Sequence, residues 1–332
     1  MVRGRVERTL SARFPRAYLS KVHAIAKALQ ALPPGAYLLA VSGGRDSMAL
    51  LQAFAEVRPG DLSAVATFDH RTGAAATQAA ELVVRECLTR GISVVVGRAP
   101  MRDARGRAAE SALREARWAF LRAVAEERRA VIVTAHTRDD QAETVAMRIL
   151  RDASARGLAG MSAPSAGIAR PLLSISREEL AHYVAATGIA FVEDPSNTDA
   201  GYLRNRLRAD LLVAAERARP GFTAELVAIG EAAAAWRGRL AEMVDALGVH
   251  RVADAVVTDA GALDGLTGPG LAVVWPEIAG RAGVVLDRRG IERLVSWSTR
   301  ARPGQRMPLS GGGMVERTVR TFVVRGALAA PA

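Results

Sequence analysis

A glycine turn between an apolar run and a helix-favouring run is the feature that most constrains this chain. Residues 36–51 read AYLLAVSGGRDSMALL, which indicates a short buried strand, a tight turn and a helix start. Asp46 or Ser47 is placed to cap the first helical turn. Paired glycines let the backbone approach an anion closely, and the N–H groups at a helix start favour negative charge. The turn predicts a phosphate-binding loop, with an ordinary strand-to-helix turn as the alternative.

The loop differs from the two commonest nucleotide-binding turns, because it lacks both G-x-x-x-x-G-K-[ST] and G-x-G-x-x-G. Residues 42–47 read SGGRDS and resemble the SGGxDS loop of the N-type ATP pyrophosphatases, the PP-loop superfamily. Enzymes of that superfamily split ATP into AMP and pyrophosphate to activate a carbonyl oxygen. The resemblance implies ATP binding and assigns nucleotide contacts to the whole loop: Ser42, Gly43, Gly44, Arg45, Asp46 and Ser47.

The charge of the chain favours a polyanionic partner. The net charge is +11 and the pI is near 11.0. Such an excess of positive charge is typical of proteins that bind nucleic acid. A GC-rich coding bias explains the preference for arginine over lysine, but it does not explain the excess. Nucleic acid is therefore the favoured partner.

Length and cysteine content limit the class of protein further. A chain of 332 residues suggests two domains. It has no apolar run of about eighteen residues that would indicate a membrane span. The basic segment 1–16 lacks the apolar middle of a secretion signal, so we expect a cytoplasmic protein. The single cysteine, Cys87, excludes internal disulfides, a Cys-ligated zinc site and a multi-Cys iron–sulfur cluster, and we expect it in the core.

Apolar runs rich in valine and isoleucine alternate with helical patterns in the first half of the chain. Strands are expected from Tyr37 and over 62–68, 92–96 and 131–134, and helices over 17–32, 77–90, 108–128 and 139–150. This order predicts an α/β fold with a doubly wound parallel sheet. Such sheets bind ligands at the carboxyl ends of their strands, where the polar clusters fall: 42–47, Asp69-His70 and 136–143.

The stretch TAHTRDDQAET at 134–144 is the second informative part of the chain. Asp139 and Glu143 are four residues apart and share one face of the expected helix. Two carboxylates on one face suit a magnesium ion or the ammonium group of an amine substrate. Helix capping alone explains one acidic residue, but hardly His136, Asp139, Asp140 and Glu143 together.

The ordered set of motifs resembles the tRNA(Ile)-lysidine synthetase family over residues from about 20 to 325. The match consists of SGGRDS, Asp69-His70, His136 with DDQAET, the set Glu110, Arg114, Arg117 and Trp118, the segments 150–161, 170–173 and 194–197, and Tyr202, Arg204, Asn205, Arg206 and Arg208. The fold implied is adenine nucleotide α-hydrolase-like. Two departures are Arg71-Thr-Gly, where the family has Gly-Leu-Arg, and Arg151-Asp152, where it often has Arg-Gly.

The resemblance implies a reaction at the wobble cytidine of a tRNA(Ile) with a CAU anticodon. ATP adenylates the oxygen on ring position 2, pyrophosphate leaves, and the ε-amine of free L-lysine displaces AMP to give lysidine. The cofactors implied are ATP and Mg²⁺. A homodimer is left open, and so are the residues of the lysine pocket.

The resemblance also suggests roles for individual residues. Asp46 is expected to bind Mg²⁺ and pyrophosphate, and Asp69 and His70 belong to the nucleotide site. Arg114 and Arg117 are expected to stabilise a phosphate or the base, and His136 is a candidate base. Asp139 and Glu143 are expected to orient the lysine ammonium or the metal. RNA phosphate binding is assigned to Arg204, Arg206 and Arg208. A solvated charged face is the alternative for these last three arginines.

The predicted organisation has four parts: a basic segment and helix (1–35), the catalytic domain (36–200), a helical tRNA-contacting region (201–247) and a small α+β tRNA-binding domain (248–332). In the last part, short valine-rich runs lie at 252–257, 272–275, 283–286 and 322–324, with one helix near 289–297 and a hairpin near 308–317. Trp236 is expected in the core.

Three other functions stay open on the sequence. A tRNA thiolase of the same superfamily would use cysteines to carry sulfur or a cluster, and Cys87 alone argues against it. An amidating ligase such as an NAD or GMP synthetase would not need the basic excess. A non-catalytic RNA-binding protein is disfavoured by the intact loop and the acidic pair.

Overall fold

The computed structural model describes residues 16–99, 107–153, 155–163, 165–193, 201, 203–310 and 312–326, with side chains from residue 23 and, in the helix that begins at Arg107, from residue 111. Segments 1–15, 100–106 and 194–200 lie outside the described residues, and so does Tyr202. The chain divides into two compact units that meet between Ala234 and Ala235. This boundary falls inside the region 201–247, which the sequence analysis treats as one part.

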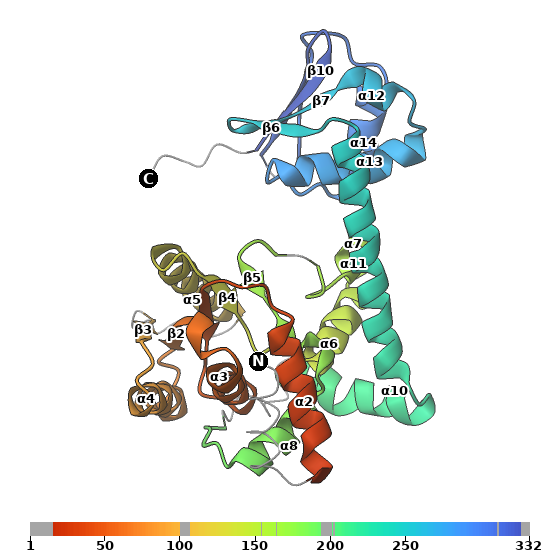
Figure 1. Ribbon diagram of the computed structural model, residues 1–332. Helices are drawn as coiled ribbons and strands as arrows, with labels where there is room; N and C mark the ends of the chain where they lie inside the picture. Colours follow the sequence, from red (N-terminus) through yellow and green to blue (C-terminus); the bar gives the residue numbers. More distant parts are fainter. Residues whose placement is uncertain are drawn as a thin grey trace. The chain divides into compact units, whose positions relative to one another are not determined.

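The first unit contains a five-stranded parallel sheet in the order β3-β2-β1-β4-β5. Figure 1 labels β2, β3, β4 and β5 of this sheet. The strands are β1 (Tyr37–Ala40), β2 (Leu62–Asp69), β3 (Val94–Arg98), β4 (Val131–Val133) and β5 (Ile168–Ala169). The prediction of a doubly wound parallel sheet is confirmed. β5 has two residues, which is too short to leave a periodic signal, and the sequence analysis missed it.

Helices cover both faces of this sheet because its strands are apolar on both sides. Leu39 of β1 packs with α2 (Arg16–Gln30), α3 (Arg45–Val57), α4 (Ala74–Thr89) and α8 (Arg177–Thr187). Its neighbour Leu38 points to the other face and packs with α5 (Arg107–Glu127). Cys87 is fully buried in the first of these clusters, as predicted, and burial raises the pKa of its thiol to about 11.

A third group of elements packs around α6 (Arg138–Ile149). It comprises α7 (Ala155–Leu158), α9 (Leu203–Arg206), the π-helical turn η4 (Leu207–Leu211), α10 (Leu212–Ala218) and the start of α11 (Phe222–Ala246). The 3₁₀ turns η1 (Pro59–Asp61) and η2 (Pro171–Ser174) complete the unit. Ala142 and Val145 of α6 form a small core with Leu207 and Leu226, so the segment after residue 202 docks onto α6.

The second unit is a small α+β module, as the sequence predicts. Its antiparallel sheet has the order β6-β7-β10-β9-β8, with β6 (His250–Val252), β7 (Ala255–Asp259), β8 (Arg306–Pro308), β9 (Met314–Arg317) and β10 (Thr321–Arg325). The helices are α12 (Ala260–Asp264), α13 (Gly268–Arg281) and α14 (Arg288–Ser298). Trp275 is fully buried and packs edge-on against Phe322, while Trp236 is partly buried against the same core.

Two of the valine-rich runs in this unit do not form strands. Run 272–275 lies within α13, whose buried positions Leu271, Val274, Trp275 and Ile278 follow helical spacing. Run 283–286 is the connection between α13 and α14. Valine content alone misled here, because a short apolar run does not distinguish a strand from a buried helix segment. Across the described residues, no helix is both long and apolar enough to cross a bilayer.

Candidate active site at the carboxyl edge of the parallel sheet

The glycine loop follows β1 and needs its first glycine. Gly43 has φ of +83°, and a Cβ atom there would lie 2.5 Å from the carbonyl oxygen of Ala79. Gly44 is the N-cap of α3, and no side chain caps this helix, so the expectation of capping by Asp46 or Ser47 is wrong. The first N–H groups of α3 are therefore not satisfied by a side-chain cap, which suits an anion.

One of the two serines of the loop braces it from inside. Ser47 Oγ donates to Gly44 O at 2.8 Å and accepts the N–H of Ser42 at 3.2 Å. Ser47 is buried, whereas Ser42 is exposed and its Oγ lies 3.2 Å from that of Ser47. The sequence assigned both residues to the nucleotide. The structure shows Ser47 as a brace of the loop and Ser42 at its open side.

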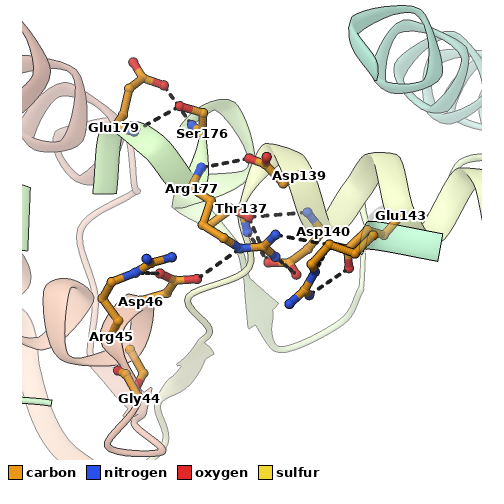
Figure 2. A network of polar contacts seen from close by, with 12 residues as sticks. Gly44, Arg45, Asp46, Thr137, Asp139, Asp140, Glu143, Ser176, Arg177 and Glu179 are labelled. Carbon is orange, nitrogen blue, oxygen red and sulfur yellow. Dashed lines mark hydrogen bonds and ion pairs between the residues drawn. The ribbon is translucent and has the colours of Figure 1, made fainter. Parts of the chain in front are cut away.

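Asp46 lies at the start of α3 between two arginines (Figure 2). Its Oδ1 is 3.0 Å from Arg45 Nε, and its Oδ2 is 3.7 Å from Arg177 Nε. The Asp46 side chain is 25% exposed, so it is the accessible carboxylate of the loop. Its partners come from α3 and α8, which places the loop beside the start of α8.

The acidic start of α6 is held by its own cap. Thr137 is the N-cap and forms a capping box with Asp140, whose Oδ2 accepts the N–H of Thr137 at 2.8 Å. Asp140 Oδ1 accepts from Arg177 Nη2 at 2.9 Å and from Arg204 Nη2 at 3.1 Å. Asp139 Oδ2 accepts the backbone N–H of Arg177 at 2.7 Å. Asp140 therefore both caps α6 and pairs with two arginines.

Glu143 is the most buried carboxylate of the site, with its side chain 1% exposed. It accepts from Arg177 Nη1 at 3.2 Å, from Arg204 Nε at 2.7 Å and from Arg208 Nε at 2.6 Å. Burial opposes ionisation, but the Arg208 hydrogen bond and the charges of Arg204 and Arg177 hold the pKa of Glu143 below its usual value. Glu143 is an ionised anchor for three guanidinium groups.

This network changes the interpretation of the arginines after residue 200. Arg204 and Arg208 were expected to share a helical face that binds RNA phosphate, and here both turn toward Glu143. Arg206, between them in sequence, is exposed. Arg204 and Arg208 therefore dock α9 and η4 onto α6, and Arg206 is the member of the set that is directed to solvent.

His136, at the end of β4, is held neutral. Burial lowers the pKa of its imidazole to about 4, against the opposing charge of Asp140, and the nearby cations Arg170, Arg204 and Arg117 lower it further. Its Nδ1 lies 2.8 Å from Thr134 Oγ1. Arg117 on α5 thus lies close to the cluster; burial, and then the charge of Arg114, lowers its own pKa. Arg114 is exposed.

Asp69 and His70 lie one strand away, at the end of β2. Asp69 is buried and accepts from the N–H of Arg71 at 2.8 Å and from Thr77 Oγ1 at 3.3 Å. The His70 ring stacks edge-on against Phe68. Arg71 has φ of +53°, in the left-handed region, where the resembled family has a glycine. Asp69 also lines a pocket of about 490 Å³ between α4 and β3.

The positions of β1 and β4 explain why these groups meet. The two strands pair in the middle of the sheet, at the point where the strand order reverses, so the loops that follow them lie side by side. The loop 42–47 and residues 136–143 both lie at this edge, and Arg177 links them.

Arg177 is the residue that the sequence analysis missed. It follows Ser176, which caps α8 and forms a capping box with Glu179. A signal was present: an arginine at the first position of a helix opposes the helix dipole and so calls for anionic partners.

A magnesium site can be tested against the described side chains. They include no group of three or more His, Cys, Asp or Glu residues that would hold a metal. Mg²⁺ with ATP is held by one or two carboxylates together with phosphate oxygens and water, so it does not need such a group. Asp46 fits this role because it is partly exposed beside the open start of α3.

Three comparisons place this chain among known proteins. The PP-loop domain family model matches residues 18–215. A tRNA(Ile)-lysidine synthase of Novosphingobium aromaticivorans is 44% identical over 216 residues, which cover 62% of this chain and 65% of that protein. The enzyme of the same name from Salinispora arenicola is 40% identical over 225 residues, 63% of this chain and 68% of that protein.

A likeness to a solved structure supports the fold. The U34-tRNA thiolase NcsA from Methanococcus maripaludis, solved with its [4Fe-4S] cluster, matches with a TM-score of 0.54 and 16% identity, over 64% of this chain and 76% of that chain. The chain belongs to the PP-loop family of ATP-binding domains. The similarity to its relatives is more specific than the domain match, and it shows that the chain belongs to the tRNA(Ile)-lysidine synthase family. Its match spans 65% of the Novosphingobium protein, just under two thirds.

Proposed function

We propose that this protein is a tRNA(Ile)-lysidine synthase, a carbon–nitrogen ligase that converts ATP to AMP and pyrophosphate. The observation that carries the proposal is the uncapped start of α3, with Asp46 beside it and the α6 acidic group next to it. The named relatives support it. The substrates are ATP, L-lysine and a tRNA(Ile) with a CAU anticodon, and the predicted location stays the cytoplasm.

The loop residues bind and orient the nucleotide. Backbone N–H groups at the start of α3 donate to phosphate oxygens, and Gly43 lets the backbone approach them. Asp46 would hold Mg²⁺, which supplies Lewis-acid stabilisation of the leaving pyrophosphate when it is bound. Arg114 and Arg117 stay the proposed partners of a phosphate or of the adenylated base, and the loop after β2, with Asp69 and His70, stays the proposed edge of the nucleotide site.

The lysine amine must lose its proton before it attacks. At neutral pH His136 is unprotonated and carries an acceptor nitrogen, so it stays the proposed base, although a pKa near 4 makes it a weak one. Asp139 is the better placed of the two proposed ammonium ligands. Glu143 would have to exchange a guanidinium for the ammonium, because three arginines already donate to it.

The second unit offers a basic face for RNA. Arg289, Arg293 and Ser296 recur at helical spacing on α14, and Arg300 follows the end of this helix. Together with Trp297 they line a pocket of about 840 Å³. The three arginines are exposed. Guanidinium groups in a row suit the phosphate backbone. We therefore assign the tRNA contacts of the second unit to this face, and Arg206 stays a proposed phosphate contact in the first unit.

The experiment that tests the proposal follows labelled L-lysine into a tRNA(Ile) transcript with a CAU anticodon, with ATP and Mg²⁺ present. Incorporation should occur, and it should be lost when the wobble cytidine is replaced by uridine. D46A should abolish pyrophosphate release while the circular dichroism spectrum stays unchanged. ATP cleavage without lysine uptake would contradict the substrate assignment, and an absence of ATP turnover would contradict the enzyme assignment.

Sulfur transfer is disfavoured by the one cysteine of the chain. Cys87 is buried within α4, and burial raises the pKa of its thiol to about 11, so it is protonated at neutral pH. A protonated, buried thiol is a poor nucleophile and a poor metal ligand. This supports amine transfer over the thiolase alternative.

A further inference from the structure

Arg177 joins the ATP loop to α6 through three separate carboxylates (Figure 2). Each nitrogen of its guanidinium faces a different one. Nε lies 3.7 Å from Asp46 Oδ2, Nη2 lies 2.9 Å from Asp140 Oδ1, and Nη1 lies 3.2 Å from Glu143 Oε1. A guanidinium is planar and its N–H groups point in fixed directions. The compact ammonium of a lysine cannot reproduce this pattern.

The backbone of Arg177 is fixed as well as its side chain. Arg177 follows Ser176, whose Oγ accepts the N–H of Glu179 at 3.1 Å, while Glu179 Oε2 accepts the N–H of Ser176 at 2.7 Å. The N–H of Arg177 itself donates to Asp139 Oδ2 at 2.7 Å. Since the first turn of α8 is tied both to itself and to α6, the guanidinium starts from a fixed point.

The three contacts are unequal. The two to α6 are hydrogen bonds, and their carboxylates are well shielded, with Asp140 13% and Glu143 1% exposed. The contact to Asp46 is longer, and the Asp46 side chain is 25% exposed. Arg177 is therefore anchored on α6, and Asp46 is the partner that remains accessible to a ligand.

We propose that Arg177 is a positioning residue of the ATP site, which restrains the Asp46 carboxylate in one orientation beside the uncapped start of α3. Arg177 touches no reacting atom in this role and acts only through Asp46. The proposal rests on the proposed function in one respect, namely that Asp46 serves the nucleotide and its metal. It makes a specific expectation: the effect of changing Arg177 should depend on the presence of the Asp46 carboxylate.

The test is a double-mutant cycle on nucleotide binding. The probe is α,β-methylene-ATP, titrated by calorimetry at a fixed Mg²⁺ concentration into the wild type, R177K, D46N and the double variant. R177K should weaken binding about 10-fold when Asp46 is present, because the partner that orients a metal ligand is lost. The same change should have less than about a twofold effect in the D46N background, since the restrained group is then gone.

Arg138 provides the matched control. It also belongs to the start of α6, but its side chain is 47% exposed and its ion pair is with Glu179, at 4.0 Å between Arg138 Nη2 and Glu179 Oε2. R138Q should bind the probe as the wild type does. Circular dichroism and the urea midpoint check the fold of each variant, and R177Q replaces R177K in the cycle if R177K proves unstable.

Two outcomes would overturn the proposal. Equal weakening in both backgrounds would mean that Arg177 acts through the packing of α6 and not through Asp46. Unchanged binding by R177K would remove the positioning role altogether. The proposed function fails separately: a wild type that binds the probe with Mg²⁺ but incorporates no lysine overturns the reaction and leaves the role of Arg177 intact.

Discussion

At the scale of single residues, burial controls the ionisation of His136. The pKa of this imidazole is about 4 in the folded protein, against 6.5 for a histidine side chain in water. Above pH 6.5 the imidazole is neutral in both the folded and the unfolded protein, so His136 adds no pH dependence to the free energy of unfolding. Between pH 6.5 and 4 the unfolded chain takes up the proton first, so the free energy of unfolding falls as the pH falls.

This sign gives a pH prediction. Going from pH 7 to pH 5, His136 should lower the free energy of unfolding by about 2 kcal/mol, and H136Q should lack that part of the loss. Urea unfolding of both proteins at the two pH values measures it. H23Q, which changes an exposed histidine on α2 of the same unit, is the control. An H136Q protein with the full wild-type pH dependence would contradict the assignment.

At the scale of elements, Glu143 fastens α9 and η4 to α6. E143Q removes the buried negative charge that three arginines share, and it should lower the free energy of unfolding by about 3 kcal/mol. Urea unfolding followed by circular dichroism checks this value. E225Q removes an exposed carboxylate, the partner of Arg219, and should cost less than about 1 kcal/mol. Equal losses in the two variants would rule out the anchoring role.

The basic face of α14 can be tested by the salt dependence of tRNA binding. R289Q and R293Q should each weaken binding and reduce the slope of log K against log [salt] by about 1, the value expected for one lost phosphate contact. R320Q removes an exposed arginine of the same unit outside this helix and should leave the slope unchanged. Nitrocellulose filter binding at several salt concentrations distinguishes the two cases.

Elements with a strong local period could be predicted from the sequence, and pairings between distant residues could not. The glycine loop, four of the parallel strands and the helix near 289–297 leave regular patterns, so the sequence places their ends within two residues. The ion pairs of Glu143 join positions more than sixty residues apart, to Arg204 and Arg208, and no local pattern encodes them. Arg204 and Arg208 looked like a surface face for that reason.

At the scale of the whole molecule, each unit has a core of its own. Trp275 and Phe322 belong to the core of the second unit, and the sheet cores of the first unit include neither. Separate cores make two cooperative units. Scanning calorimetry should therefore show two transitions. At 100 times its dissociation constant, α,β-methylene-ATP with Mg²⁺ should stabilise only the first unit, by about 2.7 kcal/mol.

Tryptophan fluorescence identifies the transitions. Three of the four tryptophans, Trp236, Trp275 and Trp297, lie in the second unit, so the fluorescence change should accompany the transition that the nucleotide leaves in place. A single transition that moves as a whole on addition of nucleotide would show instead that the two units unfold together.

The two neighbouring glycines of the loop should differ in their tolerance of mutation. A Cβ at Gly43 would strike the Ala79 carbonyl, whereas at Gly44 the nearest atom is Ser42 Oγ at 3.6 Å. Consider a library of all single codon changes, selected in cells whose growth depends on this gene. Alanine should disappear from it at position 43 and persist at position 44. Survival of alanine at both would contradict this. Of two adjacent glycines, Gly43 should therefore stay unchanged during evolution, whereas Gly44 can be replaced.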